Sequence, residues 1–180
     1  MQNTFLSVRD YHIKSSDVFF FDNNIWMYLA CPLGNYALYK QKAYSGFYSY
    51  VLERKNQIFI NSLVLAEFSN RFLKLDFNLR YGNRAKQYHY KKDYVGTKYY
   101  LDTIAVINAE LHKIVSFCTR CSDEFNAINF EEVLQLFNEI GFNDSYYCHL
   151  AASKKWIIVT DDSDFSKGKI PDLGLTILKY

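Results

Sequence analysis

The sequence predicts an α/β fold: a three-layer α/β/α sandwich with a central parallel sheet of about four to five strands. Two observations support this prediction. Short, continuous apolar runs rich in β-branched and aromatic residues recur along the chain, and longer segments with helical spacing separate them. Continuous apolar runs are typical of strands buried on both faces, as in parallel sheets, and parallel strands need such long crossover connections.

The first predicted strand is the apolar run at 17–22, which places Asp22 at its C-terminal end. Asn23 and Asn24 can begin the helix that follows, and this helix stops at Pro32, which cannot continue it. A second helix is predicted over about 36–55. Asp22 therefore lies where a buried strand turns into a helix.

The next predicted strand covers 57–60, and Asn61 with Ser62 offers a cap for the helix after it. Glu67 lies in the early turns of that helix. The last part of the chain has further elements with clear sequence signals. They are a helix at about 130–140 ended by Gly141, a helix from Asn143 to Lys155, a strand at 156–160, a turn at 161–164 and a strand at 175–178.

Residues 76–100 form a segment that is rich in Tyr, Lys and Arg, and it precedes a long predicted helix at 101–121. We predict a helical insert here with breaks at Gly82 and Gly96. Its tyrosines could stack on single-stranded bases while its basic residues meet phosphates. Alternatively, they pack within a helix pair or form an oligomer interface, and we favour this interpretation because basic and aromatic composition alone is weak evidence for nucleic-acid binding.

Composition indicates one ordered domain covering 1–180, because 180 residues can bury a sizeable core and 49% of them are hydrophobic. The formal net charge of +2 is too small to indicate a polyanionic partner by itself. No segment has the signature of a signal peptide or of a transmembrane span, so we expect a cytoplasmic protein without membrane contact. The four cysteines are then expected to be reduced, buried or half-buried thiols, since Cys118-x-x-Cys121 has no partner motif at zinc-ligand spacing.

Two acids are predicted at the same edge of the sheet. Asp22 closes the first strand and Asp162 follows the strand at 156–160. Glu67 and Asp144 lie near helix N-termini that can approach this edge, where open parallel sheets usually bind ligands. Four carboxylates at one place would repel, and Mg²⁺ or Mn²⁺, which prefer oxygen ligands, would relieve that repulsion. Asp164 could be a further metal ligand.

Each acid also has an ordinary structural interpretation. Asp144 could cap its helix, and Asp162 and Asp164 could form the turn after the strand. Asp22 could form a hydrogen bond with the turn that follows it, and Glu67 could be an exposed helical residue. Their joint placement is what favours a metal site.

Three blocks of the sequence stand out: the run from Val18 to Ile25, the segment Leu65-Ala66-Glu67-Phe68, and the stretch from Asn143 to Ala152 with Ile158 to Phe165. Together they resemble the PIN-domain ribonucleases, including VapC-type toxins. The resemblance covers about 18–178. The last block, an acid-led helix followed by a strand and a T-x-D-x-D-F turn, is the most specific, and the Glu67 block is weak alone.

The resemblance implies a hydrolase that cleaves RNA with Mg²⁺ or Mn²⁺, with Asp22, Glu67, Asp144 and Asp162 as catalytic, metal-binding carboxylates. It implies Asn24, Thr160 and Asp164 as supporting residues. It further implies a toxin with an antitoxin partner, and a homodimer. The Tyr-rich segment and Asn23, where the family often has Thr or Ser, depart from the pattern.

Two other functions stay open. The first is an inactive module of the same fold that binds RNA or a protein without turnover. The second is a phosphatase or phospho-receiver domain, since both place Asp at strand ends. The stretch Asp22-Asn23-Asn24 lacks the D-x-D pair of such phosphatases, and no Lys follows a late strand in the receiver arrangement.

Overall fold

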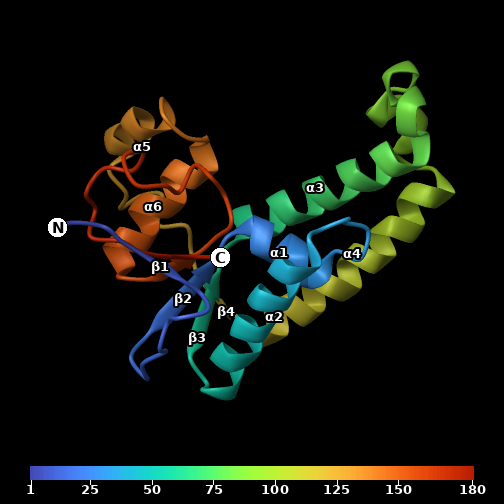
Figure 1. Cartoon of the computed structure of the whole chain (residues 1–180). Coiled ribbons are helices and arrows are strands. Elements are labelled where there is room, and N and C mark those ends of the chain that lie inside the picture. Colours follow the sequence, from blue (N-terminus) through green and yellow to red (C-terminus); the bar gives the residue numbers. More distant parts are fainter.

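A single sheet of six parallel strands forms the centre of the protein, in the order β1-β6-β5-β2-β3-β4 (Figure 1). The computed structural model describes residues 1–180, apart from the side chains of Asn83 and Ala85. The strands are β1 (Thr4–Ser7), β2 (Val18–Phe21), β3 (Gln57–Ile60), β4 (Thr119–Arg120), β5 (Ile157–Val159) and β6 (Thr176–Lys179). The predicted α/β fold with a parallel sheet is thus confirmed.

The helices are α1 (Asn23–Ala30), α2 (Leu38–Glu53), α3 (Ser62–Tyr81), α4 (Lys98–Phe117), α5 (Phe130–Phe137) and α6 (Phe142–Lys154). A 3-10 turn, η1 (Gly82–Gln87), and a π-helical turn, η2 (Tyr90–Tyr94), connect α3 to α4. The predicted breaks at Gly82 and Gly96 fall at the two ends of this connection, where both glycines have positive φ. Among the described residues, no helix is both long and apolar enough to cross a membrane.

The side chains of β2 show the three layers. Phe19 and Phe21 point to one face, where their rings lie 5.6 and 6.3 Å from that of Phe47 on α2. Phe20 points to the other face, where its ring lies 5.1 Å from that of Tyr147 on α6. Each phenylalanine of β2 is almost fully buried, so the apolar run at 18–21 is continuous because helices cover both faces of the sheet.

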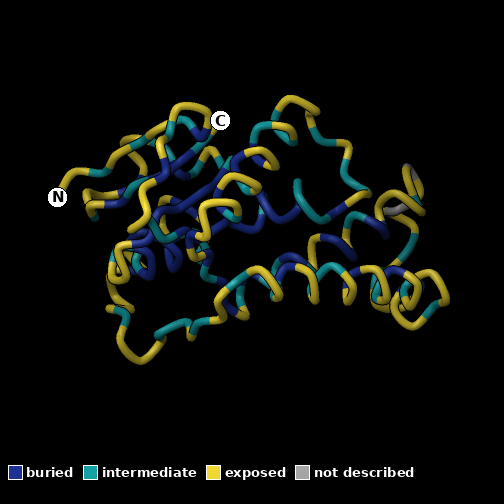
Figure 2. Tube along the Cα trace, turned by 90° about the horizontal axis from the view of Figure 1, so that it is seen from below, coloured by how far each residue is buried: buried dark blue, intermediate teal, exposed yellow. Residues whose placement is uncertain are grey.

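Helices α3 and α4 pack against each other as a long arm that extends away from the sheet (Figure 1). Figure 2 shows buried residues concentrated in the body and recurring along one side of the arm helices. Within the arm, Tyr94 is fully buried and its hydroxyl donates to Asp76, 2.7 Å away. Arg80 donates to the same carboxylate at 2.6 Å. Tyr94, from the Tyr-rich segment, is therefore part of the packed interior of the arm.

Two strands and two helix ends differ from the prediction, and the first of these ends is that of the helix predicted over about 101–121, which stops at Phe117. Strands β1 and β4 lie at the edges of the sheet and were not expected, because an edge strand of two to four residues with exposed side chains gives no apolar run. Gly141 does not end α5, which stops at Phe137; it is the N-cap of α6. The four cysteines are free, two buried and two half-buried, as predicted.

Candidate functional site

The carboxyl ends of β2 and β5 lie side by side in the middle of the sheet. From β2 the chain goes on to β3 on one side, and β5 pairs with the other side of β2. A position where the strand order reverses in this way is the usual ligand-binding crevice of an open α/β sheet. Asp22 directly follows β2, and Thr160 directly follows β5. Sequence reasoning therefore placed Asp22 and Asp162 at the correct edge.

Asp22 is the most firmly held of the acids. It is 3% exposed and caps α1, because its Oδ1 accepts from the backbone N–H of Asn23 at 2.6 Å. Its Oδ2 accepts from Asn24 Nδ2 at 2.5 Å and from Thr160 Oγ1 at 2.7 Å. Asn24 and Thr160, the two predicted supporting residues, thus both contact Asp22. Both carboxylate oxygens already have partners, so its position is fixed.

Glu67 lies in the second turn of α3, whose N-cap Asn61 accepts from Val64 N–H at 3.1 Å. Asn23 Nδ2 donates to Glu67 Oε1 at 3.2 Å, and Asn143 Nδ2 donates to Oε2 at 3.1 Å. The Glu67 side chain is 25% exposed, so it is not simply a solvated helical residue. Two amides that flank the other acids therefore orient it.

Asp144 lies in the first turn of α6 without capping it, since the N-cap is Gly141. None of the described residues donates a hydrogen bond to its half-buried carboxylate. A Cβ at Gly141 would lie 3.1 Å from Asp144 Oδ2, so glycine at this position leaves room for the carboxylate. Asp144 is the acid of the group with the least support from hydrogen bonds.

Asp162 and Asp164 form the turn after β5. Asp162 Oδ1 accepts from Asp164 N–H at 2.9 Å, and Asp162 N–H donates to Thr160 Oγ1 at 3.0 Å. Asp164 pairs with Lys169 at 2.6 Å. Lys169 thus already engages the carboxylate of Asp164, the predicted additional ligand, while the backbone N–H of Asp164 helps to close the turn.

The acids act on one another electrostatically. Burial raises the pKa of Asp144 to about 8, helped by the negative charges of Asp22, Asp162, Glu67 and Asp164. Burial also raises the pKa of Asp22 to about 6; Glu67 and Asp162 add to the rise, while hydrogen bonds from Thr160 and Asn23 oppose it. The predicted acids therefore do lie together, and their mutual repulsion is only partly relieved by the protein.

A metal ion would have to fit this arrangement. Among the described residues, no three His, Cys, Asp or Glu side chains stand so that they could hold a metal ion. The donor chemistry does suit a hard cation, because Mg²⁺ keeps several waters and binds proteins through one or two carboxylates. Asp144, and Oδ2 of Asp162, are without donors among the described residues. The residues thus fit a hydrated cation and do not form a closed cage of ligands.

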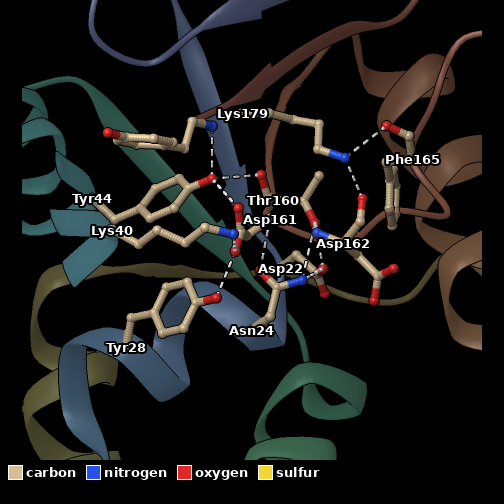
Figure 3. A network of polar contacts seen from close by, with 11 residues as sticks. Asp22, Asn24, Tyr28, Lys40, Tyr44, Thr160, Asp161, Asp162, Phe165 and Lys179 are labelled. Atoms are coloured by element: carbon tan, nitrogen blue, oxygen red, sulfur yellow. Dashed lines mark hydrogen bonds and ion pairs between the residues drawn. The ribbon is translucent and has the colours of Figure 1, made fainter. Parts of the chain in front are cut away.

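Asp161, between Thr160 and Asp162 in the turn, is held by further contacts of the same polar network (Figure 3). Its Oδ2 accepts from Tyr28 at 2.5 Å and from Lys40 at 2.7 Å, and its Oδ1 accepts from Tyr44 at 3.1 Å. Its backbone N–H donates to Asn24 Oδ1 at 3.0 Å. Helices α1 and α2 therefore both fasten the turn that carries Thr160 and Asp162. Lys179 adds a bond from β6 to the Asp162 carbonyl oxygen.

Tyr147 brings a buried hydroxyl to the same place from the second turn of α6. Its side chain is fully buried, and its hydroxyl has no hydrogen-bond partner among the described residues. Burial raises the pKa of this hydroxyl, and the nearby negative charges of Glu67, Asp22 and Asp144 raise it further. Sequence reasoning missed the site roles of Asn23, Asn143, Tyr147 and Asp161. The signal for three of them is adjacency: each directly precedes or follows a predicted acid in the sequence.

Fold and site together define an α/β protein with an acidic centre at the switch point of a parallel sheet. No family model matches the chain, and no curated protein matches it.

Proposed function

We propose that the chain is a Mg²⁺- or Mn²⁺-dependent endoribonuclease of the PIN-domain type, with the acidic centre as its active site. The observation that carries the proposal is the Asp144 carboxylate, which is half-buried among four other acids and has no donor among the described residues. Clustered carboxylates whose pKa values are raised in this way are typical of functional sites. A cation is the ligand that would stabilise them as anions.

The roles of the residues follow from their contacts. Asp22 presents a fixed negative charge, because Thr160, Asn24 and the start of α1 hold both its oxygens. Asp144 and Asp162, with free oxygens, would hold the cation, and Glu67 is oriented toward the same place by Asn23 and Asn143. A bound divalent cation would polarise the scissile phosphate and make a bound water more acidic. Asp144 would lose its proton as the cation binds.

Replacing Asp144 or Asp22 by Asn tests the proposal. We expect either variant to lose at least about 100-fold in Mn²⁺-dependent cleavage of single-stranded RNA, since each removes an anion from the centre. Glu53→Gln is the matched control, because Glu53 is an exposed acid at the end of α2, before β3 begins at the opposite edge of the sheet. Cleavage that survives both site substitutions would contradict the mechanism.

A binding module without turnover is the second candidate. The observation in its favour is that no three potential ligands among the described side chains are arranged to hold a metal ion. It predicts that the purified chain binds RNA while neither Mg²⁺ nor Mn²⁺ produces cleavage. The toxin role, an antitoxin partner and a homodimer extend the first proposal, and they rest on the sequence resemblance alone.

A further inference from the structure

A polar stripe with two cations runs along the exposed face of α3, away from the acidic centre. It begins at Glu67 and continues through Asn70, Arg71, Lys74 and Asn78, which follow one another at helical spacing, and the last four are exposed. At about 1.5 Å per residue, Lys74 stands about 10 Å along the helix from Glu67. The stripe thus connects the site to two exposed cations, Arg71 and Lys74.

Two hollows flank this stripe. The first, of about 500 Å³, is lined by Glu67 and Asn143 from the site and by Arg71, Lys74 and Tyr90. The second, of about 310 Å³, lies on the other side and is lined by Tyr36, Asn35 and Asn78 together with the same Arg71 and Lys74. Arg71 and Lys74 therefore form a basic ridge between two hollows, one of which has Glu67 of the acidic centre in its wall.

The two cations of the ridge are available to a ligand. Arg71 meets Glu67 only at 3.5 Å, and its side chain is 53% exposed, so this ion pair holds it weakly. Lys74 has no carboxylate within salt-bridge distance among the described residues; its Nζ lies 5.2 Å from the Phe77 ring centre. By contrast, Lys169 is paired with Asp164, and Lys179 donates to two carbonyl oxygens.

Each hollow also has a half-buried tyrosine in its wall that is fixed by its neighbours. The Tyr90 ring packs 5.5 Å from Phe77 and 5.3 Å from Tyr94. The Tyr36 ring packs 4.8 Å from Tyr28, and any Cβ at Gly34 would collide with it. Aromatic rings held beside cations are the usual means of binding single-stranded nucleic acid, because bases stack on the rings while phosphates meet the charges.

We infer that the Arg71–Lys74 ridge with its two hollows is a binding track for single-stranded RNA, which leads a few nucleotides of the strand to the acidic centre. The part of this inference that leads the strand to the acidic centre rests on the proposed function. The ridge supplies positive charge beside a cluster of carboxylates, which would repel the phosphates of the strand when no cation is bound. The tyrosines favour a single strand, whose bases are free to stack, over a duplex.

The test is the double variant Arg71→Ala/Lys74→Ala, with Lys98→Ala/Lys113→Ala as the matched control. The control removes the same charge from exposed positions on α4. Binding of a short, unstructured, fluorescein-labelled RNA is measured by anisotropy in EDTA over a range of salt. We expect the ridge variant to bind the RNA at least about 10-fold more weakly than the wild type. The slope of log K against log salt should become shallower by about 1.4, because two phosphate contacts are lost. The control should match the wild type.

Steady-state cleavage in Mn²⁺ separates the two proposals. The ridge variant should raise KM with little change in kcat, whereas Asp144→Asn should lower kcat. If the wild type binds RNA through the ridge but never cleaves it, the proposed nuclease fails and the track stands. Equal weakening by both double variants, tight binding of a blunt RNA duplex, or no RNA binding by the wild type would overturn the track, the last in favour of a protein partner.

Discussion

At the scale of single residues, Asp144 is the group whose ionisation is most opposed by the fold. Its pKa is raised from 3.8 to about 8, first by burial and then by the surrounding acids. The folded chain therefore binds this proton more tightly than the unfolded chain does. The stability that the proton contributes is fully present below pH 3.8 and is lost as the pH rises through about 8.

This difference predicts the pH dependence of stability in the metal-free chain. We expect its Tm to fall as the pH rises from about 5 to about 8, and the fall to be smaller in Asp144→Asn, which has no charge to bury. Scanning calorimetry in EDTA measures both profiles. Glu53→Gln should keep the wild-type profile, and an Asp144→Asn profile parallel to that of the wild type would show that Asp144 does not titrate in this range.

The residues found from sequence and those missed differ in the kind of contact they make. Asp22 and Asp162 are set by the strand that precedes each of them, so local pattern was enough to place them. The bond from Asn143 to Glu67 joins residues 76 positions apart in the sequence, and it exists only because α3 and α6 meet at the edge of the sheet. A local sequence pattern does not show which residues far apart in the chain come into contact.

At the scale of elements, the buried strands were predictable and the edge strands were not. The run at 157–159 is fully buried and reads as apolar, whereas β4 has two exposed residues and is defined only by pairing with β3. The turn after β5 is another case. Its sequence, Asp161-Asp162-Ser163-Asp164, indicates a turn, but the partners of Asp161 come from α1 and α2, far away in the chain.

Asp161 should therefore matter to how the helices hold this turn. Asp161→Ala removes the acceptor of Lys40, Tyr28 and Tyr44, and we expect it to lower the free energy of unfolding by about 2 kcal/mol. The loss should not be larger, because the Lys40 side chain is 30% exposed and its charge is screened by water. Urea unfolding measures the change, and Asp161→Asn, which keeps an acceptor oxygen, should lose less. A loss below about 0.5 kcal/mol in the alanine variant would mean that the turn is held by its backbone contacts alone.

At the scale of the whole molecule, the body and the tip of the arm differ in how they are stabilised. Strands β2 and β5 are buried on both faces in one aromatic and aliphatic core. The tip, made of η1 and η2, is mostly exposed, and it is fastened to α3 by the bonds from Tyr94 to Asp76 and from Tyr81 to the Asp93 carbonyl oxygen. Asp76 itself is 3% exposed. We infer that the tip can open without the body.

Hydrogen exchange tests this difference in stability. In the wild type, the amides of β2 and β5 should be the slowest to exchange, and those of residues 82–97 should exchange much faster, through local opening. Asp76→Ala leaves the buried Tyr94 hydroxyl without its partner, which costs about 1–3 kcal/mol, so exchange at the tip should rise by about 10-fold or more. Exchange in β2 and β5 should stay as in the wild type. The matched control, Asp102→Ala, removes an exposed ion pair with Lys98 and should leave both regions unchanged. If Asp76→Ala instead accelerates exchange equally at the tip and in the sheet, the arm and the body unfold together, and the two regions form a single cooperative unit.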